Sequence, residues 1–172
     1  MTKIRPETPA DAVAIHSVNK QAFDGREAEP RLVDAIRQSD GYISELSLLA
    51  EENDQIIGHI LFSRIHIQSE NEQLPALALA PMAVLPGYQK QGIGSALVRH
   101  GLEECKRLGH TIIIVLGHPA YYPRFGFTPE LAKSLECPFG DCGNAWMALE
   151  LIPGALDGVR GKIIYPAAFD GA

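Results

Sequence analysis

Hydrophobic residues near the start of the chain follow a helical repeat. Thr8-Pro9-Ala10-Asp11 predicts a helix start, since Thr8 can cap the helix and Pro9 fits its first position. The apolar side of this helix comprises Val13, Ile15, Val18, Ala22 and Phe23. A second helix is expected between Pro30 and Asp40-Gly41. Its inward side comprises Leu32, Val33 and Ile36.

Shorter apolar segments around these helices are typical of strands. A strand at Lys3–Arg5 precedes the first helix. Leu46–Glu51 and Ile56–Ile67 are expected to pair in antiparallel fashion across a polar turn at 52–54. Gly58 lies within the second of these strands, where it predicts a bulge or the close approach of another element.

The longest apolar run, Ala76–Leu85, predicts a strand that is covered on both faces. Pro86-Gly87 ends it, and a glycine-rich loop then opens a third helix. The apolar stripe of that helix is Ile93, Leu97, Gly101, Cys105 and Leu108. Gly109 ends the helix. The β-branched run His110–Leu116 is expected to be a buried strand parallel to the earlier one, because a helix connects the two.

The remaining third of the chain has weaker patterns. A short helix is expected at Ala120–Arg124, and 128–144 is typical of a long loop with a helical turn at Glu130–Leu135. Ala145–Leu151 predicts a late strand, and Lys162–Tyr165 predicts an exposed edge strand.

The loop before the third helix has the composition of an anion site. The first N–H groups of a helix have no partners within it, and the helix dipole adds positive charge there. Gly92 and Gly94 lack the Cβ atoms that would keep a pyrophosphate away, Ser95 adds a hydroxyl and Lys90 adds a cation. The spacing is neither that of a P-loop nor that of a dinucleotide fingerprint. The alternative is a helix start without a ligand.

Two motifs, in this order, resemble the GNAT superfamily of N-acetyltransferases. Gln89-Lys90-Gln91-Gly92-Ile93-Gly94 is similar to the family's acetyl-CoA-binding motif, [Arg/Gln]-x-x-Gly-x-[Gly/Ala]. Tyr121–Phe127 is similar to its later Phe-Tyr-x-x-x-Gly-Phe signature. The longer run Leu-Gly-His-Pro-x-Tyr-Tyr-Pro-Arg-Phe-Gly-Phe, at 116–127, resembles that of a bacterial subgroup. The resemblance covers about residues 3–151.

The resemblance implies an α/β (α+β) fold in which helices flank a mixed, mostly antiparallel sheet. It also implies that two central parallel strands, Ala76–Leu85 and Thr111–Leu116, splay apart at their C-terminal ends. The pantetheine arm of acetyl-CoA would lie between them. We expect residues 1–172 to form a single domain, with a family-like core at about 3–151 and a C-terminal extension at 152–172.

The implied activity is acetyl-CoA-dependent N-acetylation of a primary amine, by direct attack, with a small molecule as the favoured acceptor. Tyr122 matches the signature tyrosine that protonates the leaving thiolate; its alternative is a packing role. Pro123 departs from the common pattern and restricts the backbone of Tyr122. Tyr121 is expected in the core. The implied cofactor-binding residues are Met82, Ala83, Val84, Gln89, Lys90, Gln91, Gly92, Ile93, Gly94 and Ser95.

The general base is not evident from the sequence. His118 ends the second splayed strand, but a loop histidine that caps backbone groups is the favoured interpretation. Glu27 and Glu29 lie in a segment that shapes the acceptor site in many family members, with solvated surface charge favoured. His59 and His66, on one strand, would flank the cleft or face solvent. Lys90 and Arg124 would contact cofactor phosphates or be exposed.

The composition and charge of the chain limit the partners, the location and the cysteine chemistry that are expected. With 46% hydrophobic and 21% charged residues, the chain is typical of soluble globular proteins. The net charge of −6 argues against nucleic-acid binding and is compatible with a cationic amine substrate. No signal segment or membrane-length apolar run is evident, so a cytoplasmic location away from membranes is expected.

Three cysteines, an odd number, favour a reducing compartment over a disulfide scaffold. No metal site is expected, because Cys137 and Cys142 lack a second ligand pair.

Two other functions stay open at this point. One is a non-catalytic acyl-CoA sensor or regulatory module on the same fold. The other is an interaction protein whose glycine loop is a plain helix start. Homodimers are common in the family, and an edge strand at Lys162–Tyr165 could pair across a two-fold axis.

Overall fold

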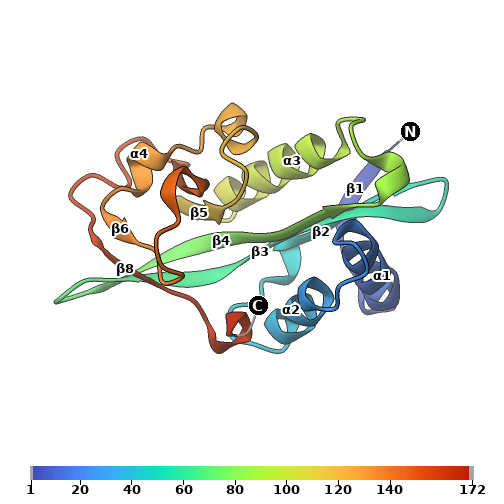
Figure 1. The fold of residues 1–172 in the computed structure, drawn as a ribbon, viewed down its shortest axis with the longest axis horizontal. Coiled ribbons are helices and arrows are strands. Elements are labelled where there is room, and N and C mark those ends of the chain that lie inside the picture. Colours follow the sequence, from blue (N-terminus) through green and yellow to red (C-terminus); the bar gives the residue numbers. More distant parts are fainter. Residues whose placement is uncertain (1, 171–172) are drawn as a thin grey trace.

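A computed structural model describes residues 2–170, which contain one eight-stranded sheet with helices on both faces (Figure 1). The main path through the sheet is β1-β2-β3-β4-β5-β7, and β8 pairs with β3 and with β6. The strands are β1 (Lys3–Pro6), β2 (Ser47–Glu52), β3 (Gln55–Gln68), β4 (Gln73–Val84), β5 (Ile112–Leu116), β6 (Leu135–Glu136), β7 (Trp146–Glu150) and β8 (Gly161–Ile164). The helices are α1 (Ala12–Ala22), α2 (Ala28–Arg37), α3 (Ile93–Arg107) and α4 (Pro129–Ala132).

The two faces of the sheet carry different helices. Figure 1 shows α1 and α2 on one face and α3 on the other. Each face has its own apolar core, one centred on Phe62, Leu97 and Val98 and the other on Ile15, Ile36 and Leu61. Most strand pairs are antiparallel, while the β4–β5 and β6–β8 pairs are parallel. The expected mixed, mostly antiparallel sheet flanked by helices is therefore confirmed.

The two central parallel strands are joined over a short stretch only. Their register pairs are Leu77 with Ile113 and Ala78 with Ile114. Beyond this point β4 runs on to Val84 with β3 as its partner. A register shift between Ile60 and Phe62 of β3 leaves an extra residue on β4, and such a bulge bends a strand. The strands thus part at their C-terminal ends, as expected from the resemblance.

Two glycines let α3 lie close to the sheet. A Cβ atom on Gly101 of α3 would stand 2.3 Å from the ring of Phe62. A Cβ atom on Gly58 of β3 would stand 3.0 Å from Leu97. The predicted close approach at Gly58 is therefore confirmed, and it holds the N-terminus of α3 beside the parting strands.

Some predicted details are wrong. Val13 was assigned to the apolar side of α1 but is 83% exposed, because it stands about 200° around the helix from the buried Ile15. The second helix begins at Ala28 rather than at Pro30, whose missing N–H is tolerated in the first turn. Leu135 belongs to β6 rather than to a helical turn.

The predicted tail strand exists but differs from the exposed edge expected. β8 pairs with β3 at His66–Gln68 on one side, and its first half pairs with β6 on the other. Little of its length is left for pairing across a two-fold axis. A homodimer stays a prediction, but this strand does not support it.

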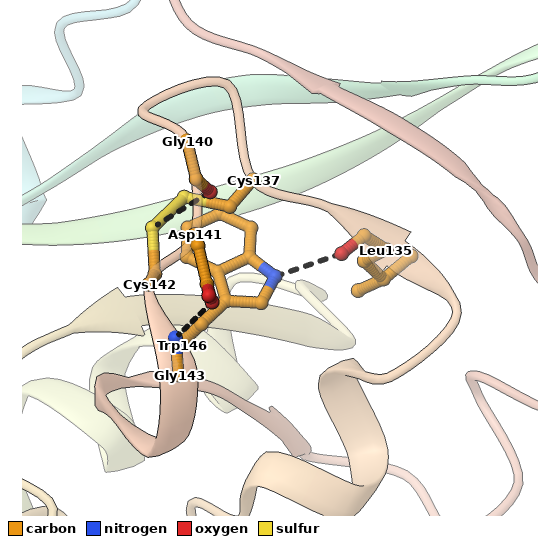
Figure 2. Close-up of a disulfide and its surroundings, with 7 residues drawn as sticks. All are labelled: Leu135, Cys137, Gly140, Asp141, Cys142, Gly143 and Trp146. Carbon is orange, nitrogen blue, oxygen red and sulfur yellow. Dashed lines mark hydrogen bonds between the residues drawn. A yellow bond between two sulfur atoms is a disulfide. The ribbon is translucent and has the colours of Figure 1, made fainter.

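The prediction that the cysteines do not form disulfides is also wrong, because Cys137 and Cys142 are joined by one (Figure 2). The bond closes a short loop between β6 and β7. Beside it, the indole Nε1 of Trp146 donates a hydrogen bond to the carbonyl oxygen of Leu135 at 2.8 Å. Cys105, by contrast, is free and buried in α3, and burial raises the pKa of its thiol to about 12.

Among the helices of residues 2–170, none has the length and apolar character needed to cross a bilayer.

Candidate active site

A cavity of about 910 Å³ opens where β4 and β5 part. The sides of this cavity come from the end of α1, the start of α2, the C-terminal halves of β4 and β5, the loop before α3, and the segment after β5. The residues that line it are Ala22, Phe23, Glu29, Leu32, Leu79–Val84, Tyr88–Lys90, Gly92–Ser95, Val115–His118, Tyr121, Tyr122 and Arg124.

The glycine loop leaves the N-terminus of α3 uncapped. Gly92 is the N-cap residue, with φ of +85°, and no side chain of residues 2–170 bonds to the first N–H groups of the helix. Gln89 donates from its side-chain amide to the carbonyl oxygen of Val84 at 3.0 Å, which ties the loop to the end of β4. A 15-residue helix with a free first turn at a cavity suits an anionic group.

The ring of Tyr122 is largely buried in an aromatic group that forms part of the cavity wall. It packs edge-on against Tyr121 and Phe127, with ring centroids 5.1 and 5.7 Å away. A Cβ atom on Gly117 would lie 2.5 Å from this ring, so the absence of a side chain there makes room for Tyr122. Burial raises the pKa of the Tyr122 phenol to about 12. Its hydroxyl has no hydrogen-bond partner among residues 2–170, although the residue lines the cavity.

Tyr121, expected in the core, packs against it while partly buried, and it also lines the cavity. Its hydroxyl lies 3.2 Å from the hydroxyl of Ser95, and Arg124 lies 4.5 Å above its ring. A tight 3₁₀ turn spans Tyr122–Phe125 with Pro123 as its second residue, and Gly126 ends that turn with φ of +106°. The two adjacent tyrosines therefore diverge: Tyr121 reaches the glycine loop and Tyr122 packs beneath Gly117.

Glu27 and Glu29 have separate environments, although the sequence treats them alike. Glu29 lines the cavity, whereas Glu27 pairs with Lys20 at 2.7 Å and with His16 at 3.3 Å. The Lys20 ammonium lowers the pKa of the Glu27 carboxyl. The expectation of surface charge holds for Glu27 and not for Glu29.

The histidines considered from the sequence lie in different environments in the structure. His118 lines the cavity, and its carbonyl oxygen accepts hydrogen bonds from the N–H groups of Tyr121 and Tyr122. Its imidazole makes no hydrogen bond to residues 2–170, so the capping role expected of the side chain is absent. His66 faces solvent.

His59 neither flanks the cleft nor faces solvent, contrary to expectation. It is fully buried between the sheet and α1. Nδ1 accepts a hydrogen bond from the amide of Asn19 at 3.2 Å, and Nε2 donates to the Ser47 hydroxyl at 2.9 Å. The Asn19 amide also donates to the carbonyl oxygen of Ile15, which fixes this assignment. Ser47 in turn donates to Glu7, whose carboxylate also pairs with Arg37 at 2.9 Å. Burial lowers the pKa of His59 to about 3, so the ring is neutral.

Of the ten residues implied to bind the cofactor, all except Gln91 line the cavity, together with Tyr122. Gln91 instead donates from its side-chain amide to the carbonyl oxygen of Gly87. Gly117, Tyr88 and the apolar residues Ala22, Phe23 and Leu32 line the site but were not predicted as parts of it. An aromatic residue in the Pro-Gly-Tyr turn was the one available signal for Tyr88. No group of three or more His, Cys, Asp or Glu side chains within residues 2–170 is arranged to hold a metal ion.

The site thus combines two parallel strands that part with an uncapped helix N-terminus beside the gap between them. Residues 3–129 match the family model of the acetyltransferase (GNAT) domain, and the chain belongs to this family of N-acetyltransferases.

Full-length relatives support the same assignment. The chain is 33% identical over 167 residues to the uncharacterised N-acetyltransferase YhbS of Escherichia coli K12, covering 97% of this chain and 98% of that protein. The crystal structure of E. coli YhbS in complex with CoA superimposes with a TM-score of 0.90 at 32% identity, over 98% of this chain and 92% of that one. A GNAT acetyltransferase from Brucella melitensis in complex with acetyl-CoA gives a TM-score of 0.80 at 33% identity, over 99% of both chains.

Proposed function

We propose that this protein transfers the acetyl group of acetyl-CoA to a primary amine of a small molecule. The observation that carries the proposal is one continuous cavity that is lined by the uncapped N-terminus of α3, by Tyr122 and by residues of α1 and α2. Two relatives of similar length and fold are described in complex with CoA or acetyl-CoA, which supports the same co-substrate here.

The residues at the loop fit a CoA pyrophosphate. The free N–H groups of Ile93, Gly94 and Ser95 would hold the phosphate oxygens, and Gly92 offers open space where a side chain would stand. Lys90 and Arg124 line the same end and would supply positive charge. Backbone groups of Met82–Val84 would pair with the pantetheine arm and donate an N–H to the developing oxyanion.

Acetyl-CoA supplies a thioester whose C–S bond breaks when the amine nitrogen bonds to the acetyl carbon. Tyr122 would give its phenolic proton to the departing sulfur, and its phenolate would be reprotonated from solvent after the thiol has left. A pKa raised to about 12 keeps this phenol protonated at neutral pH, and its hydroxyl has no competing acceptor among the described residues. His118 lines the cavity with an unbonded imidazole, and we propose it as the group that takes the amine proton.

The first test is a thermal-shift titration with acetyl-CoA, followed by an amine panel with detection of the released thiol. A ligand that binds the folded state raises the melting temperature with concentration. Tyr122→Phe should leave this shift intact and lower kcat about 100-fold, which lies within the usual range for a lost proton donor. Tyr121→Phe is the control for loss of an adjacent phenol. A clear shift without turnover of any amine would favour a non-catalytic acyl-CoA sensor, and no shift in folded protein would refute the proposal.

A further inference from the structure

The charged side chains of the cavity are separated by sign. Lys90 and Arg124 lie at the end formed by the glycine loop and the segment after β5. Ala22 and Phe23 at the end of α1, and Glu29 and Leu32 of α2, line the cavity from the face of the sheet opposite to α3 (Figure 1). Glu29 is the one acidic side chain among the described residues that line the cavity. The side of the cavity formed by α1 and α2 is therefore anionic, and under the proposed function we take it as the acceptor side. The net charge of −6 favours the approach of cations.

The Glu29 carboxylate lacks a strong hydrogen-bond partner among residues 2–170, which favours the binding of a cation. Its Oε1 atom is buried and accepts no hydrogen bond from residues 2–170. Arg26 is its ion-pair partner, at 3.4 Å from each carboxylate oxygen, but the Arg26 side chain is 62% exposed. An ion pair that long and that open to water contributes little. A buried carboxylate oxygen without a hydrogen bond is unfavourable, and a donor from a ligand would relieve it.

The surroundings of Glu29 are apolar. Ala22, Phe23 and Leu32 line the cavity beside it, and Leu79 continues this apolar surface toward the end of β4. Methylene groups would pack against these side chains, whereas a densely hydroxylated substrate would leave its hydroxyls without partners there. The site thus suits a positive charge carried on an alkyl chain.

The nitrogen that attacks a thioester must be neutral, so a carboxylate that holds a lasting positive charge suits a group other than the reacting amine. We therefore propose that Glu29 binds a second, non-reacting ammonium group, and that the acceptor class is alkyl diamines and their longer polyamine relatives. This inference rests on the proposed acetyl transfer and adds its substrate class. Glu29 is then a specificity-determining residue of the acceptor site.

The test compares unbranched α,ω-diamines of three to eight carbons with monoamines of the same length, by thiol release with acetyl-CoA. The wild-type protein should show a kcat/KM at least tenfold higher for the preferred diamine than for its matched monoamine. Glu29→Gln should lower the diamine value at least tenfold and change the monoamine value less than twofold. Glu27→Gln, with the same charge change two residues away and outside the cavity, should keep the preference.

A second measurement separates this inference from the proposed function. Calorimetry of the same amines with CoA-saturated protein should show tenfold weaker diamine binding in Glu29→Gln, whether or not turnover occurs. An absence of turnover with every amine refutes the proposed acetyl transfer. Diamine turnover or binding that is unchanged in Glu29→Gln refutes the role of Glu29. An equal loss for diamines and monoamines also refutes it, because Glu29 would then act on the reacting amine.

Discussion

Gly117 and Tyr122 fit together without room for a side chain between them. A Cβ atom on Gly117 would lie 2.5 Å from Cε2 of the Tyr122 ring and 3.0 Å from Cδ2. Gly117 directly follows β5, and Tyr122 begins the tight turn that comes next in the chain. The end of a buried strand therefore sets the position of the phenol that we propose as proton donor.

Gly117→Ala should displace the Tyr122 ring and lower kcat at least tenfold, with a smaller effect on acetyl-CoA affinity. Steady-state kinetics with any amine that the protein accepts would measure this. When Gly117→Ala is added to Tyr122→Phe, the further loss in kcat should be small, because the displaced hydroxyl is already absent. Gly87→Ala is the control, since a Cβ atom there meets open space. Fully additive losses would contradict the link between the two residues.

Gly92→Glu should abolish most acetyl-CoA binding by placing a carboxylate at the open N-terminus of α3. The acidic side chain suits the helix dipole, so the helix should persist, at a cost of about 1 kcal/mol for a non-glycine residue in the left-handed region. Gly109→Glu is a matched control, because Gly109 has φ of +90° and open space but lies at the opposite end of α3. Thermal-shift titration should show the acetyl-CoA response lost in the first variant and kept in the second. Equal responses would argue against an anion site at Gly92.

Acidification should destabilise the protein through His59. Its pKa is about 3 when folded and about 6.5 in an unfolded chain, so between these values the unfolded state binds a proton that the folded state does not. The free energy of unfolding therefore falls as pH decreases below about 6.5, by about 2 kcal/mol at pH 5. Denaturant titrations should show the stability advantage of wild type over His59→Gln shrinking by about this amount between pH 7.5 and 5. His66→Gln, on the exposed side of the same strand, should show no such change relative to wild type.

Reduction of the Cys137–Cys142 disulfide should lower stability by about 2 kcal/mol, the entropic effect of a closed loop this short. Melting temperatures with and without a reductant would measure the change, which should vanish in a Cys137→Ser/Cys142→Ser variant. Unreduced, denatured protein should react as one free thiol, that of Cys105. Three reactive thiols in protein purified without reductant would contradict the bond.

The order of elements and the glycine loop could be predicted from the sequence because they depend on local chemistry. Alternation, apolar runs, and the turn residues at 53–54 and at Gly109 are local signals, and the structure has positive φ values at these three positions. The Gln-x-x-Gly-x-Gly motif is likewise contiguous, so its helix start was evident. The location of the chain in the cytoplasm and its division at residue 151 remain predictions.

Tertiary structure alone decided which side chains share the cavity. Glu27 and Glu29 are two residues apart in sequence, yet one pairs with Lys20 and the other lines the site, because successive helical positions point in different directions. Tyr121 and Tyr122 are adjacent but diverge at a tight turn, and His59 is enclosed by Asn19 and Ser47 from distant segments. The Cys137–Cys142 pairing also depended on how the 137–142 loop closes. Sequence determined the elements and the glycine loop, while long-range packing determined which side chains line the cavity, since burial and proximity are properties of the assembled sheet.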